Sequence, residues 1–264
     1  MNRKKLLRIL PWITTPGLLI VLFVVWEITV KALDVSPLIL PPPSLIFEGL
    51  GSVLGEASTW SHIRVTVIQI LIGFTAGTFA GVVVGVLLGK LPLLEASVRP
   101  LIIALEVIPK VALIPLFVIW FGFGMTTKII IAGLLAFFPV MLNVLLGVRS
   151  VDRGHRDVMQ SINASRWQTF KHLEVKSMMP HVFAGMETAI VLAVIGTIVG
   201  EYLGGNEGLG YLVVRTLNEL NAPALFAVIL ILATIGLIMY FTVNSLKRFV
   251  IPWHESVYGR RESA

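Results

Sequence analysis

Four long stretches without a charged side chain are the feature that most constrains this fold. No Asp, Glu, Lys or Arg occurs in residues 9–26, 65–89, 129–148 or 220–246. A helix of about 20 apolar residues crosses the roughly 30 Å hydrocarbon core of a bilayer, so each stretch is long enough or nearly so. Only 14% of all residues are charged, against about 25% in soluble domains. The sequence therefore predicts an all-α, polytopic transmembrane helical bundle.

The apolar stretches predict about six spans within a single domain, residues 1–264. The spans cover about 12–33, 63–89, 100–121, 127–149, 181–204 and 223–246. The basic start followed by apolar residues imitates a signal peptide, but no small-x-small cleavage site ends the apolar run. We therefore expect the first segment to remain as a membrane anchor.

The distribution of basic residues predicts that the N- and C-termini are both cytoplasmic. With the N-terminus inside, most of the 21 Lys and Arg residues fall on inner segments, and positively charged residues resist translocation. These segments are the N-terminus, the second connection, the long loop 150–180 between spans four and five, and the tail with Arg260 and Arg261. The net charge of +6 is thus a topology signal, and no nucleic acid partner is expected.

The connections differ in character. After Pro41–Pro43, Ser44 is a candidate N-cap for a short amphipathic helix to about residue 54 on the outer surface. A glycine-rich turn, 204–211, opens a second amphipathic outer stretch that runs to about Asn221. The inner loop 150–180 is polar and far longer than a helix hairpin needs, which makes it a candidate docking element for a cytoplasmic protein.

Glycines recur at four-residue spacing in two of the spans. They are Gly73, Gly77, Gly81, Gly85 and Gly89, then Gly196, Gly200, Gly204 and Gly208. Glycines four apart follow one ridge of a helix, so they let a neighbouring backbone approach closely. The rows predict a tightly packed bundle, and they leave open whether this surface is static or slides during transport.

Ionisable residues inside the spans are the candidate pathway residues. Such side chains are costly in lipid and usually face a cavity or a partner. Glu106 and Lys110 stand four apart on one helical face, so a self-neutralising pair is the alternative to a pathway role. Pro109 and Pro115 interrupt the same helix and are expected to kink it. The candidate pathway set is Glu106, Pro109, Lys110, Glu187 and Glu201.

Residues for catalysis are not recognisable in the chain. The phosphate-loop pattern GxxxxGK[ST] is absent, since Gly89 and Lys90 are followed by Leu91. The chain has no cysteine, and its histidines lie in connections or at span edges without metal-ligand spacing. We therefore expect no enzyme activity, no catalytic residues, no metal and no cofactor.

The chain resembles the membrane subunits of binding-protein-dependent ABC importers, especially the nitrate/sulfonate/taurine-type permeases. The resemblance is carried by Ile108–Gly124 (IPKVALIPLFVIWFGFG), Phe137–Pro139, Ala164–Trp167 and Gly208–Leu212. It implies a permease in the inner cell membrane that moves a small solute, such as a sulfonate, taurine, nitrate or a small heterocycle. The implied partners are two ATP-binding cassette ATPases, an extracytoplasmic solute-binding protein and a second, identical permease chain.

The family's inner loop carries a motif EAA-xxx-G-x9-I-x-LP that docks on the ATPase. Asp157, Val158 and Met159 stand at its first three positions, Asn163 replaces the glycine, and the terminal proline is missing. Asn tolerates positive φ better than most residues, so we expect Asn163 to keep the turn. The resemblance assigns ATPase coupling to Asp157, Ser161, Asn163, Ala164, Ser165, Arg166 and Trp167.

A stand-alone secondary carrier or channel is the alternative function. It would use Glu106, Lys110, Glu187 or Glu201 for ion coupling. The absence of an evident internal repeat and the large inner loop disfavour it.

Overall fold

The computed structural model describes residues 3–253, and the side chains from Thr14 onward. Within that range every regular element is a helix. The helices are α1 (Arg3–Ala32), α2 (Pro43–Gly55), α3 (Ala57–Lys90), α4 (Pro92–Val107), α5 (Ile114–Phe121), α6 (Met125–Arg149), α7 (Arg153–Ser161), α8 (Arg166–Thr169), α9 (Val175–Gly204), α10 (Leu209–Asn218) and α11 (Ala222–Val250). A 3₁₀ turn, η1 (Lys110–Leu113), precedes α5, and a π-helical turn, η2 (Phe170–Glu174), joins α8 to α9.

Five helical segments are long and apolar enough to cross a membrane. They lie in α1, α3, α6, the continuous stretch from α8 to α9, and α11; a sixth span results if α4 and α5 are counted as one broken span. This confirms the predicted all-helical multi-pass architecture.

The third span differs in shape from the single helix expected over 100–121. Its two halves, α4 and α5, meet at an angle of 82°. Pro109 has no amide hydrogen and pushes the preceding residue, Ile108, out of the helical region, to ψ 125°. Pro115 then sits in the first turn of α5, where a missing amide hydrogen costs nothing. The expected kink is therefore a complete break.

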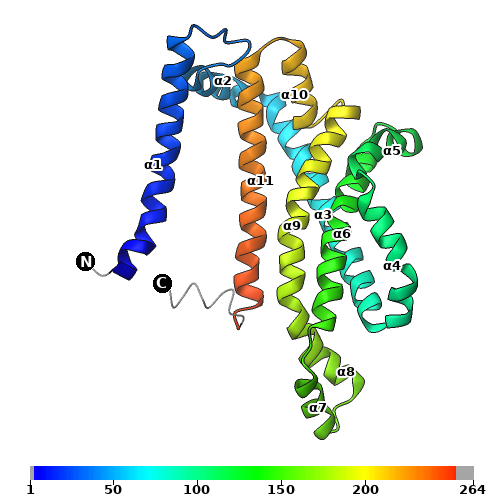
Figure 1. Cartoon of the computed structure of the whole chain (residues 1–264). Coiled ribbons are helices and arrows are strands. Elements are labelled where there is room, and N and C mark those ends of the chain that lie inside the picture. Colours follow the sequence, from blue (N-terminus) through cyan, green and yellow to red (C-terminus); the bar gives the residue numbers. More distant parts are fainter. Residues whose placement is uncertain (1–2, 254–264) are drawn as a thin grey trace.

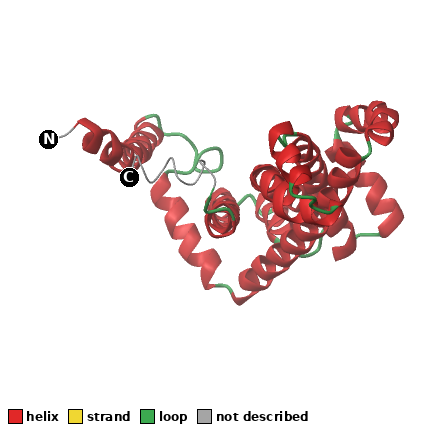
Figure 2. Ribbon diagram, turned by 90° about the horizontal axis from the view of Figure 1, so that it is seen from below, coloured by secondary structure: helices red, strands yellow, loops and turns green. Residues whose placement is uncertain are grey.

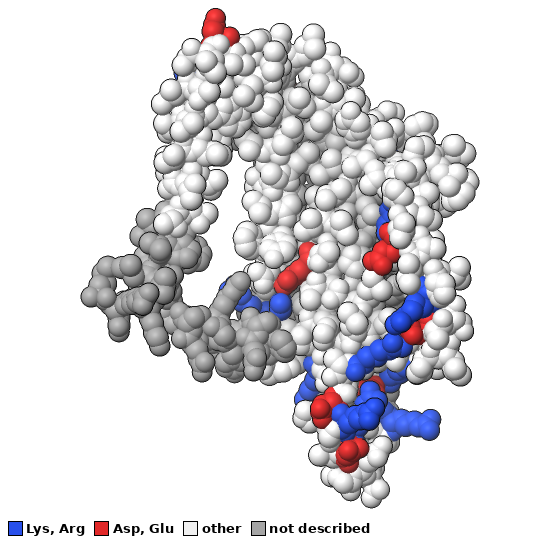
Figure 3. Space-filling view, in the orientation of Figure 1, with Lys and Arg blue, Asp and Glu red and all other residues white. Residues whose placement is uncertain are grey.

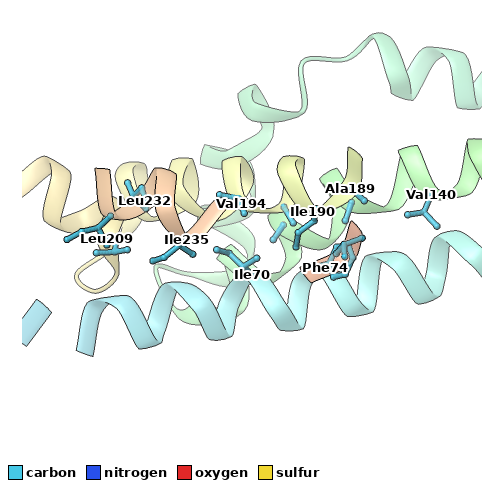
Figure 4. Close-up of a cluster of buried hydrophobic side chains, with 14 of the residues drawn as sticks. Ile70, Phe74, Val140, Ala189, Ile190, Val194, Leu209, Leu232 and Ile235 are labelled. Carbon is cyan, nitrogen blue, oxygen red and sulfur yellow. The ribbon is translucent and has the colours of Figure 1, made fainter. Parts of the chain in front are cut away.

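The core of the bundle is formed by α3, α6 and α9, and the glycine row of α3 faces α6. A Cβ atom on Gly77 would lie 2.2 Å from the carbonyl oxygen of Gly133, and one on Gly85 would lie 2.7 Å from that of Met141. Figure 4 shows the apolar side chains that fill the space between these helices and α11. The predicted close packing is confirmed; Gly208, by contrast, lies beyond the end of α9.

α1 stands apart from this core in both views (Figures 1 and 2). It meets α2 and the start of α11 through aromatic contacts, with Phe23 6.2 Å from Phe47 and Trp26 6.2 Å from Phe226 between ring centroids. Most of its side chains from Thr14 onward are exposed.

The amphipathic helix predicted after Pro41–Pro43 is present as α2, but Ser44 does not cap it. The N-cap is Pro42, with Pro43 as the first helical residue, a position that suits proline because its φ is preset for a helix. The Ser44 hydroxyl and amide both donate to the Glu27 carboxylate of α1, at 2.8 and 3.0 Å. A charged acceptor on another helix replaces the local cap.

The start of α1, the end of α11 and the segment α7–α8 lie at the same end of the molecule (Figure 1). Most charged side chains visible in Figure 3 gather there as well. The described start of α1 and end of α11 therefore lie on the same side of the molecule, and the cytoplasmic location of the two termini stays a prediction. Arg260 and Arg261, which contribute to that prediction, lie outside the described residues.

Candidate docking segment and transport pathway

The docking segment, residues 152–170, projects beyond the ends of α6 and α9 (Figure 1). Its first helix, α7, is capped by Asp152, whose side chain accepts a hydrogen bond from the Gly154 amide at 2.7 Å. A tight turn follows, in which the Ala164 amide donates to the Met159 carbonyl oxygen at 2.9 Å. Asn163 has a φ of +54° in this turn, which confirms that it adopts the left-handed conformation at the family's glycine position.

A capping box fixes the second half of the segment. The Ser165 hydroxyl accepts a hydrogen bond from the Gln168 amide at 3.2 Å, and the Gln168 side chain accepts one from the Ser165 amide at 2.7 Å. This reciprocal pair satisfies two amides at the start of α8. The turn and both helix starts are therefore set by local sequence.

Three large apolar side chains on this segment are largely exposed. Val158, Ile162 and Trp167 are 59%, 66% and 68% exposed. Asp157, Ser161 and Arg166 are exposed beside them, while Ala164 is half-buried. Exposed apolar groups rimmed by polar residues are typical of a protein-binding surface.

Two ion-pair clusters lie near the base of the docking segment, and sequence reasoning identified neither; the first attaches the segment to a span, and the second joins two spans. Glu174 lies 2.9 Å from the Lys90 ammonium of α3 and 4.0 Å from the Arg156 guanidinium of α7. The Lys90 ammonium also lies 4.0 Å from the centroid of the Phe170 ring. These contacts join the docking segment to the C-terminal end of α3.

The second cluster is centred on Glu95, which is buried in the first turn of α4. It pairs with Arg99 at 2.8 Å and with Arg149, the last residue of α6, at 3.1 Å. The four-residue spacing of Glu95 and Arg99 was a visible signal for the first pair. The second pair depends on tertiary structure alone.

The five candidate pathway residues lie in three separate places. Glu106, Pro109 and Lys110 line a cavity of about 330 Å³ at the break between α4 and α5, together with residues of α6 and α9. The Lys110 ammonium donates to the backbone carbonyl of Glu106 at 3.2 Å and lies 4.7 Å from the centroid of the Phe138 ring. Among the described residues no ion pair joins Glu106 to Lys110, so the self-neutralising alternative is not formed.

Glu187 belongs to a contact between two spans. Its carboxylate lies 3.2 Å from the Lys247 ammonium, so the pair connects α9 to the last turn of α11. Both side chains are largely buried. A buried charge with a direct partner is expected to hold two helices together.

Glu201 is fully buried near the C-terminal end of α9 and holds the first turn of α10. Its carboxylate accepts hydrogen bonds from the Thr66 hydroxyl at 2.7 Å and from the Gly210 amide at 2.8 Å. The Thr66 oxygen in turn accepts from the Leu209 amide at 2.8 Å, and His62 Nδ1 accepts from the Gly208 amide at 3.0 Å. Three successive amides, those of the N-cap Gly208 and of the first two residues of α10, are thus tied to side chains of α3 and α9.

Gly208 is required by this arrangement. Its φ is +102°, and a Cβ atom there would lie 2.0 Å from Oε1 of Glu201. Nearby, the buried Lys128 donates to the carbonyl oxygens of Phe123 and, at 2.9 Å, of Gly204, the last residue of α9. Sequence reasoning missed the roles of His62, Thr66 and Lys128, and the only available signal was their polarity at the ends of apolar windows.

The comparisons with known proteins agree with this geometry. Residues 77–252 match the family model described as "binding-protein-dependent transport system inner membrane component". The chain is 33% identical to a formylaminopyrimidine transport permease protein of Halalkalibacterium halodurans, over 89% of this chain and 94% of the relative.

Two further relatives are matched over nearly their full lengths. A riboflavin transport system permease protein of Chloroflexus aurantiacus is 31% identical, over 93% of this chain and 92% of the relative. A taurine transport system permease protein of Escherichia coli is 30% identical, over 91% and 90% respectively. The chain therefore belongs to the family of binding-protein-dependent transport system inner membrane components and is a multi-pass membrane permease subunit of the ABC transporter type.

Proposed function

We propose that this permease works as a dimer of identical chains with one separate ATP-binding cassette ATPase under each docking segment. ATP hydrolysis then takes place on the ATPases, and the permease chain itself catalyses no reaction. The observation that carries the proposal is the capped, projecting segment 152–170 with Val158, Ile162 and Trp167 exposed at its surface.

In this proposal the docking segment transmits motion to the spans. ATP-driven closure of the ATPases pulls on residues 157–167, and the Glu174 contacts with Lys90 and Arg156 pass the displacement to α3. Because α3, α6 and α9 pack backbone to backbone at their glycines, they respond as one body. The pathway between the two chains then alternates between inward-open and outward-open states.

The cavity at the α4–α5 break is the proposed contact site for the solute on its way through. It combines the Lys110 ammonium with the face of the Phe138 ring and with the Glu106 carboxylate. A cation beside an aromatic surface suits a small organic anion or a small planar heterocycle. Relatives named as permeases for taurine, for formylaminopyrimidine and for riboflavin fit this class.

An extracytoplasmic solute-binding protein is the proposed partner at the other end, with both termini and the docking segment in the cytoplasm. It would dock on the turn 205–211 and on α2. The buried hydrogen bonds from Thr66 and Glu201 to α10 support this, because they hold the turn in one conformation before any partner arrives.

The test is a pull-down of the tagged chain from mildly solubilised membranes of its own host. Our proposal predicts a co-purifying ATPase with vanadate-sensitive turnover. A chain that purifies alone, without nucleotide hydrolysis, would favour the alternative of a secondary carrier. Transport that stops when the proton gradient is abolished at constant ATP would point to that alternative as well.

A further inference from the structure

A cavity of about 540 Å³ lies between the inner end of α3 and the docking segment. The proposed transport cycle gives it no role. Polar and charged side chains dominate its wall: Lys90, Arg156, Gln160, Arg166, Thr169 and Glu174. Figure 3 shows basic side chains gathered over this end of the helices and the α7–α8 segment.

The charges in the wall do not balance. Glu174 is the one acidic residue among the wall residues, and it lies 2.9 Å from the Lys90 ammonium and 4.0 Å from the Arg156 guanidinium. Arg166 forms no ion pair within the described part of the chain. The wall therefore carries three cations and a single carboxylate, and two of the cations are guanidinium groups, whose planar fork of donors fits phosphate oxygens.

The surface beside the cavity is apolar. Lys90 is the last residue of α3, so the cavity lies where a membrane span ends. The following turn exposes Leu91, Leu93 and Leu94, with Leu93 87% exposed. A basic cavity next to exposed leucines at the end of a span matches an amphiphile with an anionic head, and the cytoplasmic leaflet is rich in such lipids.

We propose that this cavity binds the phosphate of an anionic phospholipid, with the acyl chains along the leucines of the α3–α4 turn. The phosphate bridges Lys90 on α3 to Arg156 and Arg166 on the docking segment. The lipid supplies the negative charge that Glu174 alone cannot, and it stiffens the connection through which the docking segment moves the spans.

The experiment uses the full-length chain, purified in detergent and stripped of lipid. Native mass spectrometry measures retention of phosphatidylglycerol and of phosphatidylcholine with identical acyl chains. We expect phosphatidylglycerol to bind more tightly, and its affinity to fall about fivefold for each basic residue removed in Lys90→Gln and Arg156→Gln. Arg248→Gln is the matched control and should bind as the unaltered chain does, because Arg248 is an exposed cation at the end of α11 that forms no ion pair with any described residue.

Charge-preserving variants and a competition arm complete the design. Lys90→Arg should retain phosphatidylglycerol fully, because the net charge of the wall is unchanged; Arg156→Lys should retain more of it than Arg156→Gln, because the charge stays although the planar fork is lost. Equal retention of both lipids, or unchanged retention in the glutamine variants, would overturn the proposal. Loss in the charge-preserving variants equal to that in the glutamine variants would overturn it too. If millimolar inorganic phosphate displaces the lipid, the cavity is a site for free phosphate, and the proposal that a lipid occupies it is rejected.

Discussion

Replacing Thr66 by Val tests the buried cluster that fixes α10 against α3 and α9. Valine has nearly the shape of threonine, so packing is preserved while the hydroxyl is lost. The change removes the donor at 2.7 Å from Glu201 and the acceptor at 2.8 Å from the Leu209 amide. Both Thr66 and Glu201 are fully buried, so water does not replace either partner.

The expected cost follows from these two contacts. A hydrogen bond to a charged group contributes about 1.5–3 kcal/mol, and a buried donor left unpaired costs about 1–3 kcal/mol. We expect the first turn of α10 to open more easily by at least about 2 kcal/mol, which corresponds to about thirtyfold faster amide exchange. Thr66→Ser keeps the hydroxyl and loses one methyl group, for about 1 kcal/mol of packing.

Hydrogen–deuterium exchange of the chain in lipid nanodiscs, read by mass spectrometry, measures this opening. The peptide that covers Gly208–Gly210 should exchange faster in Thr66→Val than in Thr66→Ser, while peptides of α11 stay unchanged. If the two variants exchange alike at Gly208–Gly210, the hydroxyl does not hold the turn and our account of the cluster is incorrect.

Two further predictions concern the core and the docking turn. Gly77→Ala places a Cβ atom 2.2 Å from the Gly133 carbonyl oxygen, so it should lower the free energy of unfolding by about 1–3 kcal/mol and the melting temperature in detergent. Gly236→Ala is the control: its Cβ atom meets its nearest neighbour at 3.8 Å, so this variant should melt as the unaltered chain does. Equal melting temperatures of the two variants would refute the close approach of α3 and α6. Asn163→Gly should preserve ATPase co-purification, because glycine accepts the φ of +54° at this position. Asn163→Val should weaken co-purification, because a β-branched residue does not accept that φ. Equal co-purification of the two variants would show that this turn does not shape the docking surface.

The spans and their packing could be predicted because both depend on patterns of residues close together in the sequence. Apolar windows predict the number and position of the long helices. The row of glycines from Gly73 to Gly89 predicts which face of α3 packs closely against another helix. Pro109 predicts a kink in the third span from sequence alone, but not that the helix breaks there completely. Its angle of 82° depends on how α4 and α5 pack afterwards, which no local pattern encodes.

The buried polar contacts could not be predicted, because they join residues far apart in the chain. Glu201 was recognised as an unusual charge, but its partner Thr66 lies 135 positions away. Glu187 was likewise visible, and its partner Lys247 belongs to another helix. In the structure both carboxylates contact a second helix. The sequence shows only that a charge lies within a span, so it cannot distinguish a contact between helices from a role in the pathway.

Departure from the family motif also proved informative at one position. The family glycine is Asn163 here, and the structure places it at positive φ, where asparagine is among the more tolerant residues. The turn is therefore preserved although the motif is not. The side chains around it, rather than the motif letters, form the surface that a partner meets.

The most direct test of the central claim is ATPase co-purification with the double variant Arg166→Glu and Trp167→Ala. Our account predicts that the ATPase is lost from this variant, because it reverses a charge and removes the most exposed of the three apolar side chains on the docking segment. Trp60→Ala, which removes a similarly exposed tryptophan at the other end of the molecule, should keep the ATPase. Full retention of the ATPase by the double variant would contradict the assignment of residues 152–170 as its docking site.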